Sequence, residues 1–186
     1  MSDGASGQYR AGETALLAVV EEAEPLVGHW RRRFDAVAAA GVPAHVTVLV
    51  PFLDIDRLDA AAMNDLRALI GEHGPFTVRF DGCGRFPDAL YLAPTPGRPF
   101  RALTEAVAAR WPEAPPYGGR FAEIVPHLTV AHGQEEHVYD EVEAVLTTRL
   151  PLTASVASVA LFVCDGDRWH RRDAFPLVGA GVGGGA

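Results

Sequence analysis

Short apolar runs alternate along the chain with stretches in which apolar residues recur every three or four positions. The runs predict β-strands and the periodic stretches predict amphipathic helices. Strands are expected at residues 14–20, 45–50, 76–80, 89–93, 126–131, 153–164 and 169–176. Helices are expected at residues 24–40, 56–72, 99–111 and 135–148. Because the helices are mixed with hairpins, this order favours an α+β fold over a doubly wound parallel sheet.

Part of this order repeats. A strand, a helix, an extended segment that begins at His45 and another helix precede the hairpin at residues 76–93. After the hairpin come a helix, an extended segment that contains His127 and a further helix. A proline lies shortly before each histidine, Pro43 in the first case and Pro126 in the second. The pattern predicts a duplication, with two similar lobes that face each other.

The length of 186 residues suits one domain, and 48% hydrophobic with 22% charged residues is ordinary for a globular protein. We expect residues 1–12 and the residues 179–186, which are rich in glycine and alanine, to be disordered. Residues 13–178 are then expected to form a single bilobal domain.

Cys83 and Cys164 are the only cysteines, and they do not form the closely spaced pairs of a zinc ribbon or a thioredoxin-type site. The polar, glycine-rich N-terminus lacks the apolar centre of a signal peptide. No apolar run approaches the roughly 18 residues that span a membrane. The sequence therefore predicts a cytoplasmic protein with two reduced thiols and no membrane partner.

The formal net charge of −8 argues against a protein that coats long duplexes, since phosphate neutralisation provides most of that affinity. A small nucleotide or one RNA end in a locally basic cleft stays compatible with it. Arginines cluster at residues 31–33 and at Arg168, Arg171 and Arg172, and their planar fork suits phosphate. The triple arginine at 31–33 is nevertheless expected to be a solvated helix face.

The chain has seven histidines, and His45 and His127 alone are followed two positions later by a threonine, Thr47 and Thr129. Side chains alternate between the two faces of a strand, so each His–Thr pair shares one face. The aliphatic residues between and after them point the other way, into a core. Two such strands would present two imidazoles and two hydroxyls to a phosphate between them.

This group of side chains suits the opening of a cyclic phosphodiester. One neutral imidazole can deprotonate water, and one protonated imidazole can protonate the leaving sugar oxygen. The threonine hydroxyls would bind and orient the phosphoryl oxygens. We therefore expect neither a metal ion nor another cofactor.

Two further histidines, His132 and His137, follow His127 at intervals of five residues. His127, His132 and His137 follow neither the helical nor the strand spacing of a zinc site, which argues against a metallohydrolase. The odd offset of His132 from His127 predicts that it lies on the opposite strand face. No catalytic role is assigned to His132.

The paired motifs, His45-Val46-Thr47 and His127-Leu128-Thr129, make the chain resemble the 2H phosphoesterase superfamily, which is also called the 2′-5′ RNA ligase-like or LigT-like superfamily. Residues 80–86 and 89–93 are similar to the mid-chain hairpin of that family. The resemblance covers roughly residues 14–176.

The resemblance implies a bilobal α+β fold with pseudo-two-fold, duplicated antiparallel sheets, flanking helices and a central cleft. It implies 2′,3′-cyclic phosphodiesterase or related chemistry on a nucleotide or RNA end, and some relatives also catalyse 2′-5′ ligation. His45 and His127 inherit the acid and base roles, and Thr47 and Thr129 the phosphate contacts. Which histidine is the acid stays open, and so does the natural substrate. A monomer is expected because the cleft is self-contained.

Five residues near the motifs are weaker candidates. Phe52, Tyr117 and Phe121 are aromatic residues of which one is expected to stack on a base, because stacking tolerates any base. Arg85 and Arg120 are candidate phosphate contacts. Two other functions stay open beside hydrolysis: 2′-5′ RNA ligation at the same site, and a nucleotide- or RNA-binding module without turnover.

Overall fold

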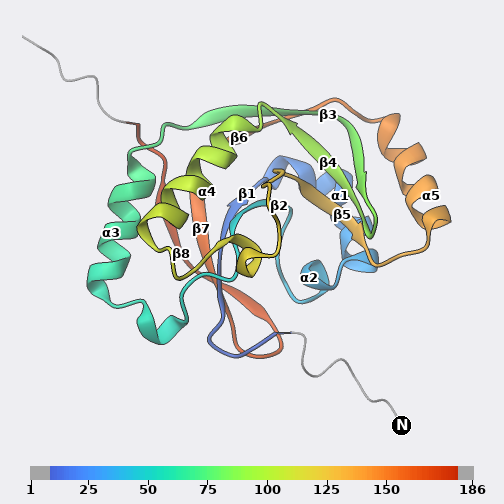
Figure 1. Cartoon of the computed structure of the whole chain (residues 1–186). Helices are drawn as coiled ribbons and strands as arrows, with labels where there is room; N and C mark the ends of the chain where they lie inside the picture. The colour runs from blue at the N-terminus through green and yellow to red at the C-terminus, as the bar shows by residue number, and fades with distance from the viewer. Residues whose placement is uncertain (1–8, 180–186) are drawn as a thin grey trace, which may run out of the picture.

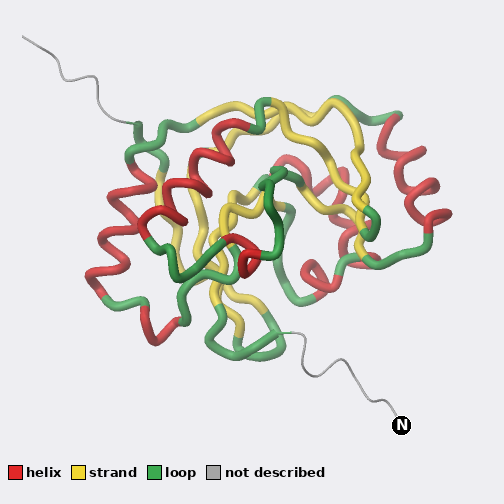
Figure 2. Tube along the Cα trace, in the orientation of Figure 1, coloured by secondary structure: helices red, strands yellow, loops and turns green. Residues whose placement is uncertain are grey.

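A computed structural model describes residues 9–179, which form two four-stranded antiparallel sheets with helices around them (Figures 1 and 2). Sheet A has the strand order β2-β1-β7-β8 and sheet B the order β5-β4-β3-β6. The strands of sheet A are β1 Thr14–Val19, β2 His45–Leu49, β7 Ser158–Cys164 and β8 Trp169–Pro176. Those of sheet B are β3 Phe76–Phe86, β4 Ala89–Thr95, β5 Leu128–His132 and β6 Leu152–Val156. The predicted bilobal α+β fold with duplicated sheets is confirmed.

Five α-helices and three short 3₁₀ turns connect the strands of the described part of the chain. The helices are α1 Glu24–Phe34, α2 Ala36–Ala39, α3 Ala60–Gly71, α4 Arg98–Arg110 and α5 Glu136–Thr147. The 3₁₀ turns are η1 Glu21–Ala23, η2 Ile55–Arg57 and η3 Pro116–Gly119. Helix α3 packs on β8 and α5 on β3 and β4, so each covers the outside of one lobe (Figure 1).

Each of the two remaining long helices, α1 and α4, packs against a strand of the other lobe. Helix α1 packs against β5 of sheet B, and α4 packs against β2 of sheet A. Leu26 and Val27 of α1 and Leu103 and Val107 of α4 are buried in these contacts and the surrounding core. Strand β2 begins at His45 and β5 begins directly after His127, so the strand of each His-x-Thr motif is supported by a helix of the other lobe.

The helix predicted at residues 24–40 is interrupted at Asp35, which has the extended angles φ −135° and ψ 111°. The Asp35 carboxylate accepts a hydrogen bond of 3.2 Å from the backbone N–H of Val37 and so caps α2. Aspartate favours this capping position over a helix interior, which explains the break. The single helix predicted here is therefore two helices, α1 and α2.

The segment predicted as one strand at residues 153–164 is two strands in different sheets. Strand β6 pairs with β3, whereas β7 pairs with β1 and β8, and Ala157 separates them. The apolar run continues through both strands because each packs in a core, so hydrophobicity alone does not show where the chain changes sheets. The hairpin of β3 and β4 is confirmed, although β3 extends beyond the predicted residue 80 to Phe86.

The helix predicted at residues 56–72 begins only at Ala60. Residues 55–57 form η2, and Asp59 caps α3 through a 2.8 Å hydrogen bond from the backbone N–H of Ala62. The other two predicted helices agree with α4 and α5 to within one residue at each end. The start of α3 is thus set by its capping residue rather than by its apolar pattern.

The main core fills the space between the sheets and helices, and a second, smaller cluster lies on the opposite face of sheet A. Its buried members are Ala15, Leu17, Val42, Ala160, Phe162, Cys164 and Trp169. Tyr9 packs against this cluster, and the Gly12 N–H donates to the Cys164 carbonyl at 2.9 Å. Residues 9–12, which were expected to be disordered, therefore belong to the folded body.

The remaining residues of both predicted tails, 1–8 and 180–186, lie outside the described residues. Within residues 9–179, no helix combines the length and the apolar character needed to cross a bilayer. Cys83 and Cys164 are both free thiols, as expected.

Candidate active site

His45 and His127 are held in the same way, each by the backbone two residues before it. The Nδ1 atom of His45 lies 2.8 Å from the Pro43 carbonyl oxygen, and the Nδ1 atom of His127 lies 2.7 Å from the Val125 carbonyl oxygen. A carbonyl only accepts, so Nδ1 is the protonated nitrogen in each neutral ring. This tautomer leaves Nε2 of each imidazole available for proton exchange with a substrate.

A β-bulge follows the threonine in each motif strand. Thr47 pairs with Leu17 and Leu49 with Leu16, which leaves Val48 as the extra residue of β2. Thr129 pairs with Tyr91 and Ala131 with Leu90, which leaves Val130 as the extra residue of β5. A bulge of this kind bends the strand and interrupts the alternation of faces.

The bulge in β5 overturns the prediction for His132. The residues Val130 and Ala131 are both buried, and His132, which follows them, lines the same cavity as His127 and Thr129. The prediction assumed that side chains alternate strictly between the two faces of the strand. The extra residue in the bulge shifts this alternation by one position, so His132 lies on the cavity side. Its imidazole Nε2 lies 3.3 Å from the Asp88 carboxylate.

Both motifs line one cavity of about 510 Å³, within the range of small-molecule sites. His45 and Thr47 enter it from the edge strand of sheet A, and His127 and Thr129 from the edge strand of sheet B and the segment before it. The structure thus brings together the four residues that the sequence placed around a phosphate.

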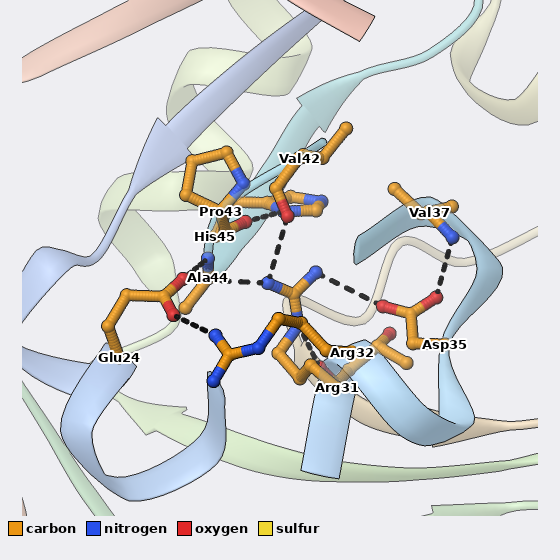
Figure 3. A network of polar contacts seen from close by, with 10 residues as sticks. Glu24, Arg31, Arg32, Asp35, Val37, Val42, Pro43, Ala44 and His45 are labelled. Atoms are coloured by element: carbon orange, nitrogen blue, oxygen red, sulfur yellow. Dashed lines mark hydrogen bonds and ion pairs between the residues drawn. The ribbon is translucent and has the colours of Figure 1, made fainter. Parts of the chain in front are cut away.

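Arg31 of α1 connects Thr129 of β5 with the segment just before β2, and Figure 3 shows its guanidinium between Val42 and Asp35. Its guanidinium donates to the carbonyl oxygens of Thr129 and Val42, at 3.0 and 3.2 Å, and to the Asp35 carboxylate at 3.1 Å. The side chain is only 2% exposed, so the prediction that residues 31–33 form a solvated face is wrong for Arg31. Arg32 does lie on the surface, 4.0 Å from Glu24.

Burial lowers the pKa of His45 to about 3, and the positive charge of Arg31 contributes to the decrease. Burial also lowers the pKa of His127, although the Val125 carbonyl opposes the change. Without an anion nearby, both imidazoles are therefore neutral at pH 7. Because a negative charge favours the protonated form, a bound phosphoryl group would raise both pKa values.

Phe86 and Tyr91 pack against the ring of His127, with ring centroids 5.0 and 5.6 Å from it. The two aromatic rings stack on each other at 4.4 Å. Gly84 pairs with Tyr91, and a Cβ atom at this position would collide with the tyrosine ring. The sequence pattern alone did not point to these residues, although the Gly84–Tyr91 pairing follows once the hairpin register is known.

Of the three aromatic candidates, only Tyr117 lines the cavity. Its N–H donates to the Val50 carbonyl at 2.7 Å, and its φ of 52° is in the left-handed region that non-glycine residues rarely adopt. Burial raises the pKa of Tyr117, and a hydrogen bond with Thr47 opposes that rise. Phe52 is instead a core residue against Trp111, and Phe121 is 62% exposed outside the cavity lining.

Of the two arginine candidates, only Arg120 lines the cavity. Its Nε donates to the Tyr117 carbonyl at 3.3 Å. Arg85 points to α5 instead, where it pairs with Glu143 and, at 2.8 Å, with Asp140. Arg85 is therefore not a phosphate contact. No group of three or more His, Cys, Asp or Glu side chains with the geometry of a metal site occurs among residues 9–179.

A family model and two named relatives match large parts of this chain. The family model described as the 2′-5′ RNA ligase superfamily matches residues 19–168. A Bacillus cereus protein named “Putative phosphoesterase” is 28% identical over 120 residues, which is 60% of this chain and 64% of that protein. A Bacillus pumilus protein with the same designation is 27% identical over 68% of this chain and 72% of its own length.

Solved structures show the same fold. The structure of Escherichia coli LigT complexed with 3′-AMP superposes with a TM-score of 0.59 at 19% identity, over 90% of this chain and 99% of that one. A Thermus thermophilus protein gives a TM-score of 0.59 at 19% identity, over 90% and 98%. Escherichia coli LigT has also been solved with NADP⁺ and with ATP.

Proposed function

The chain belongs to the 2′-5′ RNA ligase superfamily, and from that premise we propose that it hydrolyses a 2′,3′-cyclic phosphodiester of a nucleotide or RNA end by two-histidine catalysis. One observation supports this above all: two imidazoles with the same tautomer, each beside a threonine hydroxyl, line one cavity. Binding alone does not need two such imidazoles, whereas an acid–base reaction does.

In the proposed reaction, Nε2 of one histidine takes a proton from water, and the water oxygen forms a bond to phosphorus. The bond from phosphorus to one ribose oxygen breaks, and Nε2–H of the other histidine protonates that oxygen. The hydroxyls of Thr47 and Thr129 donate to the non-bridging oxygens, where negative charge develops. The proton that one histidine gained and the other lost then returns through solvent.

The negative charge of the substrate prepares the pair for these roles. Both pKa values are low because the rings are buried, and the phosphodiester raises them when it binds. The two rings have different neighbours, so one retains its proton more readily than the other. One neutral and one protonated imidazole is the state that the reaction needs.

Ligation is a second candidate because the matching family model has a 2′-5′ RNA ligase description. If the hydroxyl of another nucleotide replaced water as the attacking group, the same proton transfers would give a phosphodiester instead of a monoester. The cavity residues required are the same. Hydrolysis and ligation therefore differ in the nucleophile that the cleft admits.

The first test is hydrolysis of the four nucleoside 2′,3′-cyclic monophosphates and an RNA 2′,3′-cyclic phosphate end in EDTA. The His45→Ala/His127→Ala double variant provides the control. Turnover by the wild type alone supports the proposal. Loss of wild-type turnover in EDTA would indicate a metal-dependent reaction instead, and nucleotide binding without turnover of any of these substrates would indicate a binding module.

A further inference from the structure

The peptide group between Pro43 and Ala44 has a side chain bonded at each of its two ends (Figure 3). At one end, the Ala44 N–H donates a hydrogen bond to Oε1 of Glu24. At the other end, Nδ1–H of His45 donates to the Pro43 carbonyl oxygen at 2.8 Å. The N–H and the carbonyl belong to one planar group, so a contact that holds the first also sets the direction of the second. We call these contacts the Glu24–His45 connection.

Neighbouring contacts hold the same segment in place. The Val42 carbonyl oxygen accepts from the Arg31 guanidinium at 3.2 Å. The Ala44 carbonyl oxygen accepts from the Val20 N–H at 2.8 Å. The Glu24 carboxylate itself lies 3.9 Å from Arg31. The segment before β2 is thus fixed on both sides of the peptide group, which leaves that group little freedom to turn away from Glu24.

Helix α1 leaves space for the Glu24 carboxylate at this position. Gly28 is buried inside α1, where alanine would favour the helix more. A Cβ atom at Gly28 would lie only 2.4 Å from Oε2 of Glu24, which precedes it by one helical turn. The missing side chain at residue 28 therefore lets the carboxylate reach the Ala44 N–H.

The second motif has no such connection. Nδ1 of His127 lies 2.7 Å from the Val125 carbonyl oxygen, and that carbonyl belongs to the peptide group between Val125 and Pro126. Proline has no N–H. No carboxylate can therefore accept a hydrogen bond from the other end of this group, and only His45 is linked to an acidic side chain in this way.

We propose that Glu24 is a positioning residue for His45 and acts through the peptide group between Pro43 and Ala44. A carboxylate makes a stronger hydrogen bond than a neutral acceptor, and hydrogen bonds in a chain strengthen one another. The Pro43 carbonyl oxygen is then a stronger acceptor for Nδ1–H, which holds the tautomer and the direction of the ring. In a Ser-His-Asp triad a carboxylate does the same for a histidine by direct contact. The effect on turnover rests on the proposed function, whereas the connection itself rests on the contacts.

Two substitutions disturb the Glu24–His45 connection in different ways. Glu24→Gln keeps an oxygen acceptor for the Ala44 N–H but removes the charge. Gly28→Ala keeps Glu24 and displaces its carboxylate, which can shift because it is the end of a flexible side chain. Since alanine also favours the helix, Gly28→Ala should not lower the midpoint of urea unfolding. A loss of kcat in this variant would then not come from a loss of stability.

Proton NMR of the Nδ1–H resonances of His45 and His127 tests the connection without any turnover. Both variants should move the His45 resonance upfield, because its hydrogen bond weakens, and should leave the His127 resonance in place. On a nucleoside 2′,3′-cyclic phosphate, both should lower kcat about tenfold and change KM less than about twofold.

Glu22→Gln is the matched control. The Glu22 carboxylate also accepts from a backbone N–H, that of Ser155 at 3.0 Å, but it lies outside the cavity lining. This variant should retain both histidine resonances and the wild-type kcat.

An unchanged His45 resonance in both variants would overturn the positioning role, and so would equal shifts of both histidines. In an active enzyme, an unchanged kcat in both variants would also overturn it. If the wild type hydrolyses no cyclic phosphate and the His45 resonance alone shifts, the proposed function fails and the positioning of His45 by Glu24 is still supported. The two proposals can therefore fail separately.

Discussion

The two lobes present the same motif from the same backbone but surround it differently. In both, the histidine Nδ1 contacts the carbonyl oxygen two residues before it, and a bulge follows the threonine. His45 lies near the buried charge of Arg31, in the part of the cavity that Ala15 and Leu17 line. His127 lies under the stacked rings of Phe86 and Tyr91.

This comparison separates what the duplication preserves from what it leaves free to change. The backbone gives both imidazoles the same Nδ1 contact and the same tautomer, as the proposed reaction at a phosphate requires. The neighbouring side chains give the two rings different proton affinities and leave room for a substrate on one side. Two histidines with the same backbone contact but different neighbours suit a reaction that needs one acid and one base.

The largest expected effect comes from removal of either imidazole. His45→Ala and His127→Ala should each lower kcat for a nucleoside 2′,3′-cyclic phosphate by about 10²–10⁴-fold, because each removes one proton transfer. Single-turnover rates measured in EDTA provide the test. His137→Ala, which alters an exposed histidine of α5, should retain wild-type kcat. A near-wild-type rate for either motif variant would remove that residue from the acid–base pair.

Arg31 provides the next largest effect, this time on stability. Arg31→Met leaves the buried Asp35 without its charge partner and frees the Thr129 carbonyl, which should cost about 3–5 kcal/mol of unfolding free energy. The other lobe has a neutral counterpart, in which the Thr104 hydroxyl of α4 donates to the Val48 carbonyl at 2.7 Å. Thr104→Val should cost only about 1 kcal/mol.

Urea unfolding of the two variants measures this difference between the lobes. Arg32→Met on the same helix is the matched control, because Arg32 is exposed and 4.0 Å from Glu24. It should change the unfolding free energy by less than about 0.5 kcal/mol. Similar costs for Arg31→Met and Arg32→Met would show that the buried network does not hold the lobes together.

Thr47→Val and Thr129→Val address the proposed phosphate contacts. Each removes one hydroxyl donor from the developing charge while it keeps the β-branched shape, so kcat/KM should fall about 10- to 100-fold. Steady-state kinetics on the same cyclic substrate measure the loss. Equal effects at the two positions would indicate that the phosphate contacts both threonine hydroxyls. An effect at only one position would indicate that it contacts one lobe.

The sequence predicted the four motif residues because their pattern is local and occurs twice. His45 and Thr47 share a face through strand alternation alone, and the same holds before the bulge in β5. His132 was placed wrongly because a bulge depends on pairing with a neighbouring strand, which the sequence of β5 does not encode by itself. Arg31 looked like a surface residue because the carbonyls that accept its hydrogen bonds are distant in the sequence. Thr129 is 98 positions away, and Val42 is 11 positions away, beyond the end of the helix.

The change of sheet at Ala157 and the contact of Tyr9 with Trp169 were missed for a related reason. Strands β6 and β7 follow each other with only Ala157 between them and no turn residue, so the pairing partners are what show the change of sheet. Tyr9 lies in a polar, glycine-rich segment, and its contact with Trp169 joins the two ends of the chain. Local periodicity predicts elements, while such contacts between distant segments depend on how the elements pack.

The smallest expected effect is on the pH dependence of stability. The pKa of His45 is about 3 in the folded protein and near its ordinary 6.5 in the unfolded chain. Above pH 6.5 the ring is neutral in both states, and between these values the unfolded state binds the additional proton. Stability should therefore fall as the pH decreases through this window.

His45→Gln should reduce the slope of unfolding free energy against pH between about pH 5 and pH 7, where few carboxylates titrate. The exposed His170, paired with Asp165, provides the comparison variant His170→Gln. An unchanged slope in His45→Gln would mean that this ring has the same pKa in the folded and the unfolded state, and the asymmetry between the two lobes would then lie in their apolar surroundings alone.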